Sequence, residues 1–261
     1  MDFASGLDLT GLQIATLVAL VFLAGFVDSI AGGGGLISLP AYFAMGLPAH
    51  TALATNKFSS FTGTLAAVFR YYKAGKVRLK LGFLAAGGAL IGSAGGTRIA
   101  LMLDAPTIQS MMLVLIPSVT LFFLLKDRIL PKPKDGEQVR HPMLISTLIG
   151  FVVGAYDGLF GPGTGTFLAI GFYAFLRLNL IEAGGNARLA NLASNFGSLV
   201  VFLINGKVLF PLALLTAAGG VAGNQLGSRL ALKKGERIVR PLMLLVLLLL
   251  MATVVRQRLM G

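Results

Sequence analysis

Long apolar runs separated by short polar stretches dominate the chain. A helix that crosses a membrane needs about 20 mostly apolar residues, and the runs divide into five segments, a polar linker and five further segments. The two sets also match in segment length, because the second segment of each set is short. The expected segments are 11–31, 36–46, 50–69, 79–103, 107–125, 142–160, 164–176, 184–204, 208–230 and 238–255. This pattern predicts an all-α, polytopic helical membrane protein.

The two sets of segments resemble each other. When the chain is shifted by 131 residues, 12 of the 45 gap-free pairs that begin at Lys57 and Arg188 are identical. The composition alone would give roughly four, so an internal duplication is indicated. We expect a first membrane repeat at 1–125, a cytoplasmic linker at 126–141 and a second membrane repeat at 142–261.

Loop charges predict how the two repeats lie in the membrane. The loop 70–80 holds five basic residues, whereas its counterpart in the second half holds only Lys207. The difference in charge reverses at the next loop of each half, because 229–240 in the second half is more basic than its counterpart 98–106 in the first. Since basic loops stay in the cytoplasm, equivalent loops lie on opposite faces. The halves are therefore expected to be inverted repeats, with short or broken helices, as in many secondary transporters.

Composition narrows the possible functions. Hydrophobic residues make up 56% of the chain, charged residues 12%, and the mean hydropathy is +0.84. A soluble domain carries about 25% charged residues, so an ordinary soluble enzyme and a disordered chain are excluded. The net charge of +12 is attributed to the basic loops rather than to nucleic-acid binding.

Motifs for chemistry are absent from the sequence. The chain has no Cys and two His, which excludes disulfides and thiolate metal sites. Neither a nucleophile elbow nor a zinc-protease motif occurs, and the glycine run lacks the ending of a nucleotide-binding loop. We expect no enzyme, no metal and no cofactor, so any transport is passive or ion-coupled.

Glycine-rich interruptions occur at the same place in both halves. The first follows Asp28 and includes Gly33 and Gly34, and the second follows Asp157 and includes Gly163 and Gly165. Unwound backbone at membrane depth is tolerated where it is buried or lines a cavity, and paired interruptions indicate a transport site. The alternative is that the glycines only allow close helix packing. We assign packing to glycines spaced every four residues, namely Gly88, Gly92, Gly96, Gly219, Gly223 and Gly227.

A basic residue lies inside one apolar segment of each half. Lys57 and Arg188 are equivalent under the 131-residue shift. A buried cation is costly in a membrane, so each needs a partner, a watery cavity or access to the interface. Amide and hydroxyl groups lie about a turn away, and together these groups suit an anion. The neighbouring candidates are Asn56, Ser59, Thr62, Asn191 and Asn195.

Two acidic residues complete the candidate site. Asp28 and Asp157 each precede a glycine-rich interruption inside an apolar segment. A carboxyl group there either carries a proton or pairs with a basic side chain. We take both residues as candidates for proton coupling, with structural ion pairing as the alternative.

These motifs resemble a known family. GFVDSIAGGGGLISLP followed by ALATNKFSS, and GAYDGLFGPGTGTF followed by NARLANLASN, are similar to the TauE/SafE sulfite exporter family, also called the toluene-sulfonate uptake permease family, in its YfcA-type branch. The resemblance covers nearly the whole chain. It implies a multi-pass carrier in the bacterial inner membrane for small sulfur-containing anions. Arg188 stands where the family more often has Lys, which keeps the charge and adds a planar, bidentate donor.

The sequence therefore predicts a secondary, proton-coupled transporter of sulfite or organosulfonates that works by alternating access. Its expected partners are a small anionic substrate, protons and the lipid bilayer, with no nucleic acid. Alternatives are an anion channel, a transporter of another small organic anion, an intramembrane enzyme and a membrane-assembly subunit.

Overall fold

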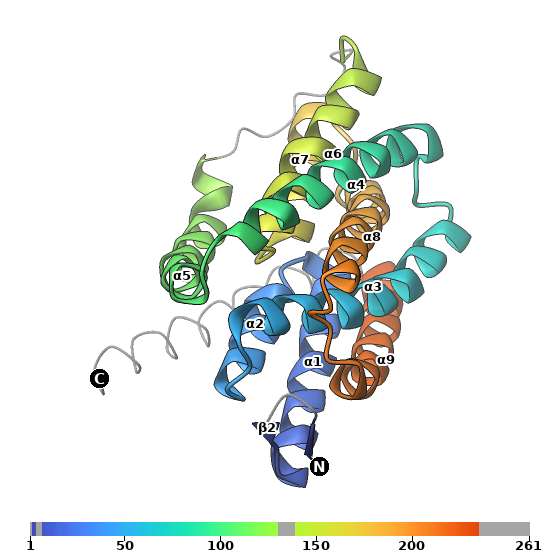
Figure 1. The fold of residues 1–261 in the computed structure, drawn as a ribbon. Helices are drawn as coiled ribbons and strands as arrows, with labels where there is room; N and C mark the ends of the chain where they lie inside the picture. The colour runs from blue at the N-terminus through green and yellow to red at the C-terminus, as the bar shows by residue number, and fades with distance from the viewer. Residues whose placement is uncertain (1, 4–6, 130–138, 235–261) are drawn as a thin grey trace.

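The fold is a bundle of helices. The computed structural model describes residues 2–3, 7–129 and 139–234, and Figure 1 shows how its helices are arranged. A short antiparallel strand pair, β1 (Asp2–Phe3) and β2 (Leu7–Asp8), precedes the first helix. The described helices are α1 (Gly11–Ala31), α2 (Gly35–Ala44), α3 (Ala49–Lys73), α4 (Leu79–Met102), α5 (Ala105–Ile129), α6 (Pro142–Leu159), α7 (Thr164–Leu176), α8 (Leu180–Ile204) and α9 (Phe210–Lys234). The predicted helical membrane class is confirmed.

Each of the first nine expected segments coincides with one helix. The tenth, 238–255, lies outside the described residues, as do 130–138 of the expected linker. α3 continues to Lys73, four residues beyond the apolar run, because basic residues in a last turn are favourable next to the helix dipole. α8 begins four residues early because the Asn179 side chain accepts a hydrogen bond from the Glu182 amide and caps the helix.

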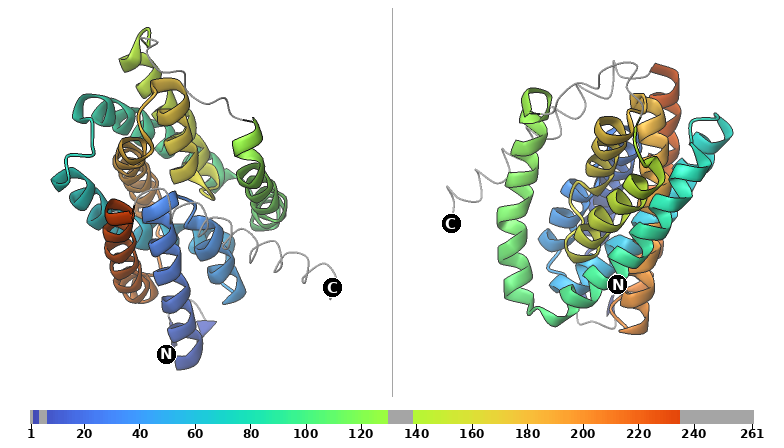
Figure 2. Two further views of the ribbon diagram at one scale, coloured as in Figure 1. Left: turned by 180° about the vertical axis from the view of Figure 1, so that it is seen from behind. Right: turned by 90° about the horizontal axis from the view of Figure 1, so that it is seen from above.

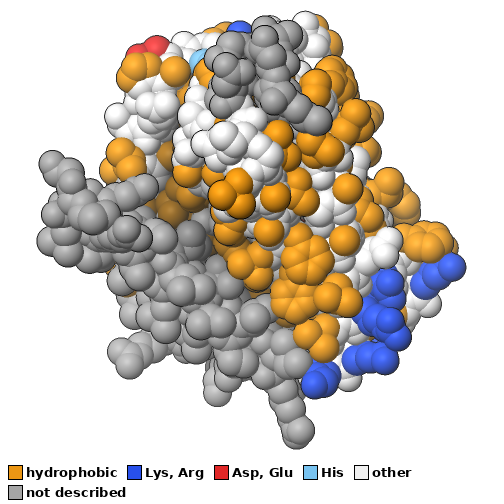
Figure 3. All heavy atoms as spheres, turned by 90° about the horizontal axis from the view of Figure 1, so that it is seen from below, with side chains coloured by type: hydrophobic (Ala, Val, Ile, Leu, Met, Phe, Trp, Pro, Cys, Tyr) orange, Lys and Arg blue, Asp and Glu red, His pale blue; other side chains and the backbone are white. Residues whose placement is uncertain are grey.

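Several helices are long and apolar enough to cross a membrane. In the described part of the chain, four meet this criterion by length and composition, namely α1, α4, α6 and α8. Large apolar side chains also lie on the outside of the bundle, for example Met102 at 83% exposure and Ile91 at 64%. Figure 3 shows hydrophobic side chains over much of one face, with Lys and Arg gathered at an edge. Such a surface suits lipid rather than water.

Glycine ridges bring two helix pairs into backbone contact. On α4, a Cβ at Gly92 would lie 2.2 Å from the Phe151 carbonyl oxygen of α6. On α9, a Cβ at Gly223 would lie 2.0 Å from the Phe22 carbonyl oxygen of α1. These contacts agree with the packing role expected for the ridges, since small residues allow membrane helices to approach closely.

The packing of the helices repeats when the two halves are exchanged. α1 packs on α9 and α6 packs on α4, while α3 packs on α9 and α8 packs on α4. α3 and α8 also contact each other across the centre. Two views in Figure 2 show these helices grouped together, with α5 at the edge of the bundle. This exchange pattern is what two structurally related halves produce.

Candidate functional site

Both glycine-rich interruptions break a helix. α1 ends at Ala31, and Gly32 and Gly33 follow with φ of 83° and 87°. α6 ends at Leu159, and Gly161 and Gly163 have φ of 92° and 82° before α7 begins. Positive φ at these positions disfavours any residue with a side chain. The predicted broken helices are confirmed at both places.

The two breaks lie against each other. A Cβ at Gly32 would lie 2.2 Å from the Thr166 backbone nitrogen, so only glycine fits. The Thr166 hydroxyl donates a hydrogen bond of 2.9 Å to the Ala31 carbonyl oxygen at the open end of α1. The start of α7 therefore satisfies a carbonyl group that the break leaves without an intrahelical partner.

Lys57 and Asp157 form a buried ion pair next to the junction of the breaks. Lys57 Nζ lies 2.7 Å from Asp157 Oδ2, with side-chain exposures of 4% and 3%. Asp157 also accepts hydrogen bonds from the Ser194 hydroxyl at 2.5 Å and the Thr164 hydroxyl at 2.7 Å. The carboxylate thus has three donors from three helices, which gives a buried ion pair the added hydrogen bonds it needs.

The equivalent pair in the site is looser. Arg188 Nη1 lies 3.9 Å from Asp28 Oδ2, and the Asp28 side chain is 15% exposed. Asp28 Oδ1 accepts a 3.1 Å hydrogen bond from the Gly34 backbone amide across the break in α1. Nε and Nη1 of Arg188 are buried without a hydrogen-bond partner among the described residues.

Both ion pairs cross between the halves. Lys57 in the first half pairs with Asp157 in the second, and Arg188 in the second half pairs with Asp28 in the first. The ion-pairing alternative from the sequence is therefore observed for all four residues. The two cations and two carboxylates balance, so the group is neutral overall when all four are ionised.

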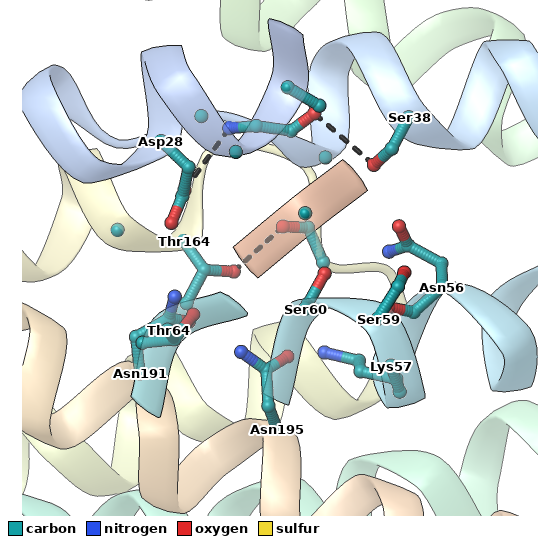
Figure 4. Close-up of a pocket in the computed structure, with 18 of the residues that line it drawn as sticks. Asp28, Ser38, Asn56, Lys57, Ser59, Ser60, Thr64, Thr164, Asn191 and Asn195 are labelled. Carbon is teal, nitrogen blue, oxygen red and sulfur yellow. Dashed lines mark hydrogen bonds between the residues drawn. The ribbon is translucent and has the colours of Figure 1, made fainter. Parts of the chain in front are cut away.

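A polar cavity lies beside the junction and is lined by residues of both halves. In Figure 4, Asp28 and Ser38 face the cavity from one side, and Lys57, Asn191 and Asn195 face it from the other. Three lining amides each keep a buried atom without a hydrogen-bond partner among the described residues: Asn56 Oδ1, Asn195 Nδ2 and Asn224 Oδ1. Unmet hydrogen-bonding capacity at a cavity is costly unless a ligand or water meets it.

Most of the residues singled out from the sequence line this cavity. They are Asp28, Gly33, Gly34, Asn56, Lys57, Ser59, Asp157, Gly163, Gly165, Asn191 and Asn195. Two others do not. Arg188 lies behind Gly165, where a Cβ would come within 2.5 Å of Arg188 Nη1. The Thr62 hydroxyl donates to the Phe58 and Ser59 carbonyl oxygens of its own helix.

Other site residues were missed in the sequence. Thr164 and Ser194 hold Asp157, but hydroxyl residues are common in membrane helices and nothing in their spacing marks them. Asn224 was missed because it follows Gly223 in a stretch attributed to packing. Its amide lies in a niche where a Cβ at Gly25 or Gly63 would come within 2.7 or 2.5 Å of Nδ2. A polar Asn within a ridge of glycines was the sequence feature that could have identified Asn224 as a site residue.

Among residues 2–3, 7–129 and 139–234, no group of three or more His, Asp or Glu side chains is placed to hold a metal. The polar groups that line the cavity are the Lys57–Asp157 ion pair, the Asp28 carboxylate, amides, hydroxyls and the backbone of two helix breaks, with Arg188 behind Gly165. Such a set can bind a small charged solute.

Helices that cross the bilayer, with paired breaks around a polar cavity, define a membrane transport protein. The family described as Sulfite exporter TauE/SafE matches residues 17–254. The chain belongs to this family, as the sequence motifs indicated.

Bacterial relatives are similar over nearly their whole lengths. A probable membrane transporter protein, YfcA, of Escherichia coli K12 is 35% identical, over 90% of this chain and 87% of its own. Probable membrane transporter proteins of a Sinorhizobium species, ORF9, and of Haemophilus influenzae are each 34% identical, and cover 92% and 96% of this chain. These alignments cover 91% and 96% of the relatives. No solved structure matches this chain.

Proposed function

We propose that this protein carries small sulfur-containing anions, such as sulfite or organosulfonates, across the bacterial inner membrane. Transport is secondary and coupled to protons, and one half rocks against the other to expose the cavity to alternate sides. The observation that carries the proposal is the pair of buried ion pairs that join opposite halves beside two touching helix breaks. A contact between halves at the cavity is where relative movement would change access.

The substrate class rests on the donors and on the family. Lys57, Arg188, Asn191 and Asn195 supply charge and amide groups near the cavity, and these groups suit oxyanions. The family description names sulfite export. Relatives are described as probable membrane transporters, which supports a carrier over an intramembrane enzyme or an assembly subunit.

The test is flux in proteoliposomes. The purified full chain is reconstituted, and uptake of sulfite, thiosulfate, methanesulfonate and acetate is measured with and without a pH gradient. We expect saturable uptake of one or more sulfur anions, stimulated by the gradient, with counterflow. Non-saturating flux without counterflow would indicate an anion channel instead.

Matched variants locate the site. Lys57→Ala and Arg188→Ala are expected to reduce saturable uptake at least about tenfold, because each removes a buried charged donor. Lys80→Ala is the control, since Lys80 is an exposed cation at the start of α4, and it should keep wild-type flux. Unchanged transport in both site variants would contradict the proposed site.

A further inference from the structure

The two ion pairs beside the cavity are chemically unequal, although they occupy equivalent places. Both oxygens of Asp157 are engaged, by Lys57, Ser194 and Thr164 at 2.5–2.7 Å. Asp28 has one backbone donor on Oδ1 and a guanidinium 3.9 Å from Oδ2. A proton on either oxygen of Asp157 would displace a short contact. Asp28 Oδ2 makes no such contact, so a proton fits there.

The cations differ in the same way. Lys57 is committed to a 2.7 Å contact with Asp157. Arg188 is 1% exposed, yet Nε and Nη1 have no hydrogen-bond partner among the described residues. A buried guanidinium N–H without an acceptor can donate a charge-assisted hydrogen bond to an oxyanion. Arg188 is therefore the cation with unused hydrogen-bond donors. It lies behind Gly165, and its ion-pair partner Asp28, 3.9 Å away, lines the cavity.

Charge balance then links the anion to a proton. The four ionised side chains sum to zero, and an anion entering alone would leave a net negative charge in a desolvated place, which is costly. One proton added to Asp28 restores neutrality and weakens its hold on Arg188. The proton comes from hydronium in the bulk solution. One O–H bond breaks in that donor and one forms on Asp28 Oδ2, so no hydroxide is left in the cavity.

We infer that Arg188 and Asp28 together take one singly charged oxyanion and one proton, while the Lys57–Asp157 pair stays closed. This inference rests on the proposed function. It assigns binding of the anion and the proton to Arg188 and Asp28, and a structural role to Lys57 and Asp157. The substrates it favours are sulfonates and hydrogen sulfite, and doubly charged sulfate is disfavoured because a second charge would remain unbalanced.

The groups around Asp28 are consistent with this assignment. Arg188 faces it from α8, Lys57 and Tyr71 from α3, and Asp157 from α6. The lining residues from α2, α7 and α9 are uncharged. Gly34 donates to Asp28 Oδ1, whereas Oδ2 is the oxygen 3.9 Å from Arg188 Nη1, so the Gly34 bond survives when Oδ2 takes a proton.

The experiment measures proton uptake on anion binding. The full chain in detergent is titrated calorimetrically with methanesulfonate in two buffers of different ionisation enthalpy. This probe keeps its charge at all working pH values, so any proton taken up goes to the protein. We expect about one proton per bound anion for the wild type and none for Asp28→Asn. The control Asp104→Asn removes an exposed carboxylate that does not line the cavity, and it should keep about one proton per anion. Sulfate should bind at least about tenfold more weakly.

Two results would overturn the inference, and neither depends on how well a variant folds. One is methanesulfonate binding to the wild type without proton uptake. The other is methanesulfonate binding to Asp28→Asn that still takes up about one proton per anion. Asp28→Asn is also checked by melting temperature, which methanesulfonate should raise more than in the wild type, because the anion neutralises Arg188. If the wild type binds neither methanesulfonate nor sulfite, the proposed function itself fails.

Discussion

Lys57 on α3 and Asp157 on α6 lie 2.7 Å apart, and both are buried. They belong to opposite halves of the chain, and the equivalent residues, Arg188 and Asp28, are paired the other way round. Each half therefore supplies the counter-ion for the other. In the proposed alternating access, relative movement of the halves would act on these contacts, and the looser Arg188–Asp28 pair would open first.

Removing only one partner of the Lys57–Asp157 pair should be more harmful than removing both. Lys57→Met leaves a buried carboxylate and should destabilise the protein by about 3–5 kcal/mol. The double variant Lys57→Met with Asp157→Leu should recover most of that stability, because no buried charge is left unpaired. The Thr164 hydroxyl, which loses Asp157 as an acceptor, still has the Gly161 carbonyl oxygen at 2.8 Å. Detergent melting temperatures measure this. A double variant as unstable as the single one would contradict the prediction.

The glycine ridge of α4 should tolerate a methyl group on one face only. Gly92→Ala places a Cβ 2.2 Å from the Phe151 carbonyl oxygen, whereas nothing lies within 4 Å of a Cβ at Gly95. We expect Gly92→Ala to destabilise the bundle by about 1–3 kcal/mol through overpacking. Gly95→Ala serves as the control and should be neutral or slightly stabilising. Equal melting temperatures for the two variants would argue against the observed α4–α6 contact.

A substitution at the helix break should cost more than the same substitution at an equally unusual backbone position. Gly32 and Gly75 both have positive φ, of 83° and 66°. At Gly75 a Cβ meets nothing within 4 Å, so Gly75→Ala costs only the conformational strain of about 1–2 kcal/mol. Gly32→Ala adds a clash with the Thr166 backbone.

This comparison is read by thermal stability and by flux. Gly32→Ala should melt lower than Gly75→Ala and lose transport, because the contact between the two breaks is disrupted. If both variants lose the same stability and keep transport, the breaks do not depend on each other.

The ion pair between Arg78 and Glu182 should contribute little. It joins the loop before α4 to the first turn of α8, with an N–O distance of 3.1 Å and side-chain exposures of 59% and 20%. Such pairs are worth about 0–1 kcal/mol. Arg78→Ala is expected to shift the melting temperature only slightly at low salt and not at all at high salt. A large, salt-independent loss would show that this contact holds the halves together.

Much of the fold follows from apolar periodicity and glycine spacing. A 20-residue apolar run has few alternatives to a membrane helix, so α1 and α6 were predicted within a residue of their ends. The breaks after Asp28 and Asp157 were also predictable, because consecutive glycines disfavour regular helix. Helix ends set by single side chains, such as the Asn179 cap of α8, were not.

The site was only partly predictable because side-chain partners depend on three-dimensional packing. The sequence brought Lys57 and Arg188 together by internal symmetry, and named Asp28 and Asp157 as possible partners. It gave no means of deciding which acid each cation meets, or that one pair is tight and the other loose. Thr62 shares its helix with the lining residues, but its hydroxyl donates to Phe58 and Ser59 carbonyl groups instead.

The most direct measurement locates the anion. Crystals of the full chain grown with 2-bromoethanesulfonate allow the bromine to be placed by anomalous scattering. The account predicts a peak in the cavity between the two breaks, with the sulfonate within hydrogen-bonding distance of Arg188. Bromine found only beside the exposed basic loop 70–80, with the cavity unchanged at saturating ligand, would contradict it.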